Sequence, residues 1–181
     1  APRALAVVCH PHPMFGGTLT NKVVHAVARA CVAQGAATLR FNFRGVGASA
    51  GSYDEGRGET DDLLAVVRYG RGRAADLPLW LGGFSFGSFV ALRGQATAGA
   101  QRLVTVAPPV GRWDFSELEA PQCPWLVVQG DQDELVDHRE VAAWMVALAP
   151  QAQLVLLPGA EHFFHGRLHE VKAAVSEFLS V

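Results

Sequence analysis

The sequence has little charge and no long apolar run. Lys and Arg number 15 against 17 Asp and Glu, and the formal net charge is only −2. This balance gives no electrostatic reason to expect binding to nucleic acid or to an anionic membrane surface. No run approaches the roughly 20 apolar residues of a membrane-spanning helix, so we expect no membrane segment. The first residues also lack the length and cleavage site of a signal peptide.

Cysteine is equally scarce. Cys9, Cys31 and Cys123 are widely spaced, odd in number and surrounded by apolar residues. Such cysteines are usually small buried hydrophobes in a reducing compartment. No C-x-x-C pair indicates a metal or redox centre. The expected location is therefore the cytoplasm.

What the sequence has is a regular alternation of apolar segments. Half of its 181 residues are hydrophobic, enough for one sizeable core. Strand-like runs cover residues 5–9, 37–43, 79–81, 103–107, 125–129 and 154–157. Segments with helical spacing follow most of these strands. The first begins at a cap, Thr18 or Thr20, and ends at about residue 34, and the second covers residues 57–70. Three more begin after Ser85, Asp137 and Gly166. We predict an α/β fold with a doubly wound, mainly parallel sheet in a single domain, residues 1–181.

One turn stands out at the third strand. Gly83-Phe84-Ser85-Phe86-Gly87 has the form G-x-S-x-G and joins a strand to a helical segment. A sharp turn there would expose the Ser85 hydroxyl as a nucleophile, and the crowded backbone would need glycine on both sides. Phe84 is expected to anchor the turn in the core. Taken alone, the pentapeptide also fits a glycine-rich turn with an incidental serine.

An acid and a base follow the next strand ends. Asp131 and Asp133 come after the fifth predicted strand, and His162 comes after the sixth. In a parallel sheet these ends lie at one edge, where such folds carry their sites. A hydroxyl, a base and a carboxylate that orients the base are the set that acyl transfer needs. Their order is that of the α/β-hydrolase triad.

Several segments together resemble the α/β-hydrolase superfamily, specifically small bacterial hydrolases without a lid that are related to the dienelactone-hydrolase-like branch. The match runs from the first strand to the last helix. It rests on His-Pro-His-Pro-Met-Phe-Gly-Gly-Thr, Arg-Phe-Asn-Phe-Arg-Gly-Val-Gly-Ala-Ser, Gly-Phe-Ser-Phe-Gly-Ser, Gly-Asp-Gln-Asp-Glu-Leu-Val and Gly-Ala-Glu-His-Phe-Phe. The resemblance implies a serine hydrolase that cleaves carboxylic esters or related small acyl compounds through an acyl-serine intermediate, without cofactor or metal.

The resemblance also implies roles for single residues. Ser85 would be the nucleophile, His162 the base and Asp133 the acid, by the G-x-x-D-x-x-V form of its loop; Asp131 remains an alternative. Two backbone N–H groups would form the oxyanion hole: that of Phe86 by the geometry of the motif and that of His12 by analogy, with Met14 or Phe15 next. Candidates for the substrate pocket, from their place in or near the predicted site loops, are Met14, Phe15, Trp113, Phe115, Phe163 and Phe164. Aromatic residues near the end of a sheet are as often part of the core.

Two departures and several alternatives remain open. The antiparallel strand pair that usually opens this fold is missing, and only a short connection stands where many members insert a cap. The second predicted strand would then be a sheet edge, and open edges tend to pair. Either the chain is incomplete or that edge pairs in a dimer, and the expected state is a monomer or a homodimer. The same triad would serve a thioesterase or an acyl-peptide hydrolase, and a non-catalytic binding protein could keep the fold. His10 with His12, or His165 with His169, could form a metal pair, but no further ligand set is evident.

Overall fold

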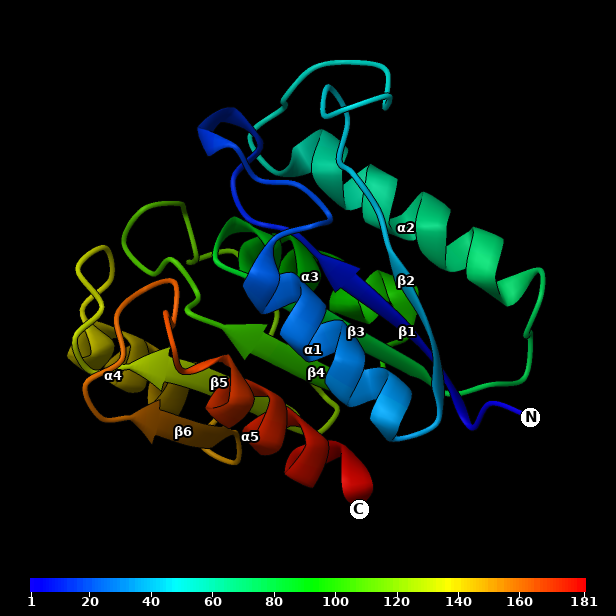
Figure 1. Ribbon diagram of the computed structural model, residues 1–181. Coiled ribbons are helices and arrows are strands. Elements are labelled where there is room, and N and C mark those ends of the chain that lie inside the picture. Colours follow the sequence, from blue (N-terminus) through cyan, green and yellow to red (C-terminus); the bar gives the residue numbers. More distant parts are fainter.

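Six parallel strands form one sheet in the computed structural model, which describes residues 1–181. The strand order is β2-β1-β3-β4-β5-β6 (Figure 1), and every neighbouring pair is parallel. The strands are β1 (Ala4–Cys9), β2 (Ala36–Arg40), β3 (Leu79–Phe84), β4 (Arg102–Val106), β5 (Trp125–Gly130) and β6 (Gln153–Leu157). The predicted doubly wound parallel sheet is confirmed, with β2 at one edge.

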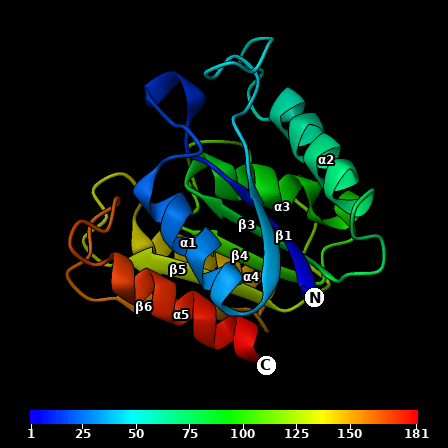
Figure 2. The same ribbon diagram turned by 45° about the vertical axis from the view of Figure 1, so that its right-hand side comes forward.

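The helices cover the sheet on both faces. They are α1 (Lys22–Ala33), α2 (Arg57–Arg71), α3 (Phe86–Ala98), α4 (His138–Leu148) and α5 (Leu168–Ser180), with a short 3₁₀ turn, η1 (Pro13–Phe15), after β1. Helices α1 and α5 lie side by side on one face, and α2, α3 and α4 cover the other (Figures 1 and 2). None of these helices is long and apolar enough to cross a membrane.

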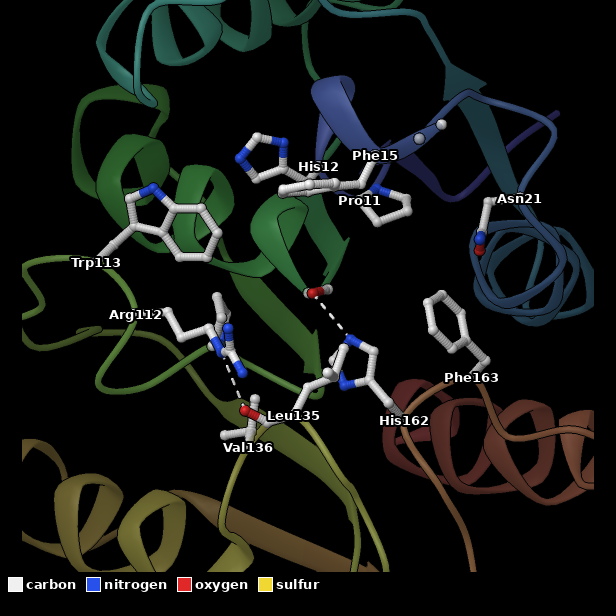
Figure 3. Close-up of a pocket in the computed structure, with 14 residues that line it drawn as sticks. Pro11, His12, Phe15, Asn21, Arg112, Trp113, Leu135, Val136, His162 and Phe163 are labelled. Carbon is white, nitrogen blue, oxygen red and sulfur yellow. Dashed lines mark hydrogen bonds between the residues drawn. The ribbon is translucent and has the colours of Figure 1, made fainter.

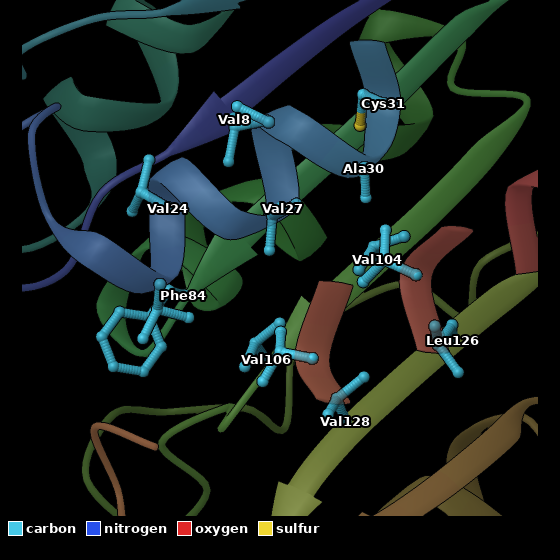
Figure 4. Close-up of a cluster of buried hydrophobic side chains, with 14 of the residues drawn as sticks. Val8, Val24, Val27, Ala30, Cys31, Phe84, Val104, Val106, Leu126 and Val128 are labelled. Atoms are coloured by element: carbon cyan, nitrogen blue, oxygen red, sulfur yellow. The ribbon is translucent and has the colours of Figure 1, made fainter. Parts of the chain in front are cut away.

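Two hydrophobic clusters, one on each face of the sheet, make up the core. Alternate residues of β1 point to opposite clusters: Ala4, Ala6 and Val8 face α1 and α5, whereas Leu5, Val7 and Cys9 face α2 and α3. Figure 4 shows part of the first cluster, to which α1 contributes Val24 and Val27 and the strands β4 and β5 contribute Val104 and Val128. Burial on both faces explains why the strands are apolar throughout rather than alternating.

Some boundaries differ from the sequence prediction. Strand β2 ends at Arg40 rather than at residue 43, because its pairing with β1 ends there and the N–H of Phe43 turns to the ring of His10. Helix α1 is capped by Asn21, whose side-chain oxygen accepts the N–H groups of Val23 and Val24. Thr18 and Thr20, the predicted caps, instead bond to each other.

Strand β3 is longer than predicted, since Gly82 and Gly83 stay in the sheet and pair with β1 and β4. Residues 107–124 join β4 to β5 without a helix or strand of their own, so there is no cap domain, as predicted. All strands run in one direction, so their carboxyl ends lie at the same end of the sheet. The first and last residues of the chain lie at the opposite end, where the strands begin (Figure 1).

Candidate active site

Ser85 occupies a strained turn between β3 and α3. Its φ of 52° and ψ of −120° are rare for a residue with a side chain. A Cβ on Gly83 would lie 2.2 Å from the carbonyl oxygen of Gly87, and a Cβ on Gly87 would lie 2.3 Å from that of Cys9. Only glycine fits either position. The close approach of Gly87 to Cys9 also packs the turn against the end of β1, next to the loop that contains His12.

The two phenylalanines next to Ser85 hold the turn from both sides of the sheet. Phe84 is fully buried in the cluster under α1 and α5, as predicted. Phe86 is fully buried in the cluster under α2, α3 and α4. Burial of both rings offsets the backbone strain at Ser85 and keeps its half-buried hydroxyl facing the loops.

A hydrogen-bonded chain joins Ser85, His162 and Asp133. His162 Nε2 lies 3.0 Å from Ser85 Oγ, and His162 Nδ1 lies 2.8 Å from Asp133 Oδ2. The side chains of His162 and Asp133 are 2 % and 0 % exposed. An ionised carboxylate only accepts hydrogen bonds, so Nδ1 carries the ring proton and Nε2 offers its lone pair to the serine hydroxyl. This is the tautomer that a general base for Ser85 requires.

Asp133 is held ionised by its surroundings. Its Oδ1 accepts the N–H groups of Leu135 and Val136 at 2.8 and 2.9 Å, and its Oδ2 accepts the side-chain amide of Gln129 at 3.0 Å. Burial alone would raise the pKa of Asp133, but the bond to His162, the charge of His162 and the two backbone donors hold it below its ordinary value. The carboxylate is therefore available at neutral pH to stabilise an imidazolium.

Gln129 is a site residue that the sequence prediction missed. It is the second-to-last residue of β5 and is fully buried. Its amide nitrogen donates to both Asp133 Oδ2 and the carbonyl of Gly130, while its amide oxygen has no partner. A polar side chain in an otherwise apolar strand was the available signal.

The other acidic residues nearby have structural contacts. Asp131 Oδ1 accepts the N–H of Gly159, a residue in the loop after β6, at 2.6 Å. Glu134 accepts the backbone N–H of His162 at 3.1 Å. Asp137 caps α4 by accepting the N–H of Arg139. The first two of these bonds, with those of Asp133, tie the loop after β5 to the loop that carries His162.

His12 lies in the loop after β1, over the start of α3. Its ring is surrounded by the rings of Phe15, Tyr53, Phe86 and Trp113, with centroids 4.7 to 5.4 Å away. Nδ1 accepts the N–H of Met14 at 3.1 Å, so the proton of the neutral ring is on Nε2. Burial lowers the pKa of His12, although the charge of Glu59 opposes this shift.

The backbone N–H groups of His12 and Phe86 are both free of partners within the protein. The N–H of His12 makes no hydrogen bond, and that of Phe86 is at the first position of α3, where a helix supplies no acceptor. The rings of these two residues pack against each other at 5.1 Å. Two free donors are thus held at one end of the turn that contains Ser85.

The other histidines considered as metal ligands, His10, His165 and His169, have different surroundings. His10 is fully buried; its Nδ1 lies 2.7 Å from the carbonyl of Pro11, and its Nε2 accepts the N–H of Phe43 at 3.0 Å. Burial lowers the pKa of His10 to about 4, against a smaller opposing effect of its bond to Pro11. With both ring nitrogens engaged, His10 links the loops that follow β1 and β2. His165 and His169 are highly exposed, as solvated residues would be.

A cavity of about 400 Å³ opens over the serine and histidine (Figure 3). Its lining consists of Pro11, His12, Phe15, Gly16, Gly17, Asn21, Ser85, Pro109, Arg112, Trp113, Leu135, Val136, His162 and Phe163. The predicted pocket residues Phe15, Trp113 and Phe163 are in this set. Met14 is not in the lining: the residue is 68 % exposed to solvent, and only its backbone N–H is directed to His12. Phe115 and Phe164 are buried in the core.

The sequence of the chain matches one family model and is similar to one curated protein. A family model described as an alpha/beta hydrolase domain matches residues 6–177. An uncharacterized protein of Rickettsia prowazekii, RP471, is 33% identical over 186 aligned residues, covering 97% of this chain and 78% of that protein.

Solved structures are similar over nearly the whole chain. A protein of Xanthomonas campestris, described as an a/b serine hydrolase without lid, is 47% identical with a TM-score of 0.94, covering 99% of this chain and 82% of that one. An alpha-beta serine hydrolase homologue of Coxiella burnetii is 43% identical with a TM-score of 0.93, covering 97% of this chain and 84% of that one.

Proposed function

The chain belongs to the alpha/beta hydrolase family, and from this premise we propose that it is a serine esterase that cleaves small carboxylic esters through an acyl-Ser85 intermediate. The observation that carries the proposal is the unbroken hydrogen-bonded chain from Asp133 through His162 to Ser85. Two solved relatives that are more than 40% identical are described as a serine hydrolase and a serine hydrolase homologue, which supports it.

In the first half of the reaction, Ser85 Oγ attacks the ester carbonyl while His162 Nε2 takes its proton. Asp133 stabilises the resulting imidazolium and fixes the ring in its tautomer. The free N–H groups of Phe86 and His12 stabilise the oxyanion of the tetrahedral intermediate. His162 then returns the proton to the leaving alcohol, and the acyl group stays on Ser85.

In the second half, His162 activates a water molecule that attacks the acyl carbonyl. The same two N–H groups hold the second oxyanion, and the proton taken from water passes to Ser85 as the acid leaves. The cavity next to Ser85 is lined largely by apolar and aromatic residues such as Trp113 and Phe163, which suits a small acyl compound.

The test is substitution of the nucleophile. We expect Ser85→Ala to lose at least a thousandfold of the turnover of p-nitrophenyl butyrate, since no other side chain supplies the nucleophile. We also expect it to lose labelling by a fluorophosphonate, measured by intact mass. Ser52→Ala is the control, because Ser52 is exposed and makes no side-chain hydrogen bond. Wild-type rates in the Ser85→Ala protein, with its fold intact by circular dichroism, would refute the proposal.

A further inference from the structure

The cavity over Ser85 has an uneven distribution of charge. Arg112 is the only Lys or Arg among the 14 lining residues, and no Asp or Glu is among them. The rest of the lining is mainly aromatic, aliphatic or glycine. Ligand cavities of this kind fix the orientation of the ligand through a few polar groups. A single guanidinium in such a lining therefore favours a ligand with one negative charge.

The guanidinium is oriented by one backbone contact. Arg112 Nε donates to the carbonyl of Leu135 at 3.1 Å, as Figure 3 shows. The N–H of Leu135 in turn donates to Asp133 Oδ1 at 2.8 Å, so Arg112 is placed relative to the loop that carries Asp133. This single bond leaves both terminal nitrogens of the guanidinium unbonded.

Those two nitrogens have no partner in the protein. No hydrogen bond or ion pair joins them to any side chain, and no carboxylate lies within 4 Å. Their N–H groups form a planar fork that matches the two oxygens of a carboxylate. A fork that is held at its Nε and free at its tip is suited to binding a carboxylate.

Two acidic residues limit what Arg112 would bind. Asp137 and Glu140 line a second depression, which shares Arg112 with the cavity. Their charges weaken the attraction of Arg112 for a small free anion. A carboxylate would be held only where the rest of the same molecule fills the aromatic part of the cavity.

We propose that the substrate is an ester that also carries a free carboxylate, and that Arg112 binds this carboxylate while the ester carbonyl lies at Ser85. This inference rests on the proposed esterase function. The carboxylate belongs either to the acyl part or to the alcohol part, and the experiment below has one arm for each.

The first arm uses 4-nitrophenyl hydrogen adipate and its methyl ester, which differ by one charge in the acyl part. The second uses 4-butyryloxybenzoate and its methyl ester, which differ in the leaving group. Each kcat/KM is divided by the uncatalysed rate. We expect the wild type to favour the charged member in one arm by about tenfold, a typical value for one charge-assisted pair. High salt should reduce this preference.

The variants are Arg112→Gln, Arg112→Lys and Arg139→Gln. The first should lose the roughly tenfold preference, and the second should keep only part of it, because lysine lacks the two-pronged fork. Arg139→Gln is the matched control, since Arg139 is exposed, unpaired and outside the cavity lining. It removes the same charge and should keep the preference. Melting temperatures check that all three proteins fold.

Three outcomes would overturn the inference. Hydrolysis of the neutral esters with no preference in either arm would refute it and leave the esterase function standing. A preference that survives in Arg112→Gln would place the carboxylate elsewhere. If no ester is cleaved and the fluorophosphonate does not label Ser85, the proposed function fails and the inference fails with it.

Discussion

Acid should destabilise the protein through His10, the buried link between the loops after β1 and β2. Its pKa is lowered from 6.5 to about 4 in the folded protein. Between pH 6.5 and about pH 4, His10 is protonated in the unfolded chain but neutral in the folded protein. The free energy of unfolding therefore falls as the pH falls through this window. Each pH unit costs about 1.4 kcal/mol, and from pH 7 to pH 4 the free energy of unfolding should fall by about 3 kcal/mol.

The comparison is with His10→Gln, whose amide also offers one donor and one acceptor to Pro11 and Phe43 but does not titrate. Urea unfolding at pH 7, 5.5 and 4, followed by tryptophan fluorescence, gives both free energies. Other titrating groups act in both proteins and cancel in the difference. The wild type should lose about 3 kcal/mol more than the variant over this range. Parallel losses would show that His10 is not held neutral by its burial.

Two further changes probe the site and the turn. Gln129→Leu removes a hydrogen-bond donor to Asp133, so we expect kcat/KM to fall about tenfold. The acid limb of the pH profile of kcat/KM should move to higher pH, because the carboxylate becomes more basic. The control Gln132→Leu, at an exposed position, should change neither quantity. Gly87→Ala would put a methyl group 2.3 Å from the Cys9 carbonyl oxygen, so its free energy of unfolding should fall by about 2 kcal/mol in urea titrations. Gly72→Ala meets nothing closer than 3.5 Å and should be neutral.

Much of the fold was predictable because a parallel sheet that is buried on both faces requires a recognisable pattern of apolar residues in the sequence. Strands covered on both faces are apolar throughout, and the helices between them carry one apolar stripe. Boundaries were harder to predict. Strand β2 ends early because the N–H of Phe43 bonds to His10, a residue 33 positions away. Capping of α1 depended on which of three neighbouring polar residues faced the first turn, and the structure selects Asn21.

The candidate site was predictable where local backbone geometry demands particular residues. Glycine at positions 83 and 87 marks the turn around Ser85, and the order of serine, acid and histidine follows the order of the strands. The residues alone did not separate Asp131 from Asp133, since both follow β5 within three positions. The structure turns Asp133 to His162 and Asp131 to Gly159.

Contacts made across loops left no local signal. Arg112 belongs to an irregular connection without periodicity, and its place in the cavity depends on the carbonyl of Leu135. Glu134 is one acidic residue among several, and only the fold brings it to the backbone of His162. Such roles follow from tertiary packing, so a single sequence does not reveal them.

The position of the chain's first and last residues has a practical consequence. Both lie at the end of the sheet where the strands begin, opposite the cavity, since β1 starts there and α5 runs back to it (Figure 1). An affinity tag, a fluorescent reporter or a bead attached at either terminus would lie on the side of the molecule away from the cavity. Immobilised molecules would then present their cavities outward, so a support coated through one terminus should retain the turnover per molecule of the free protein.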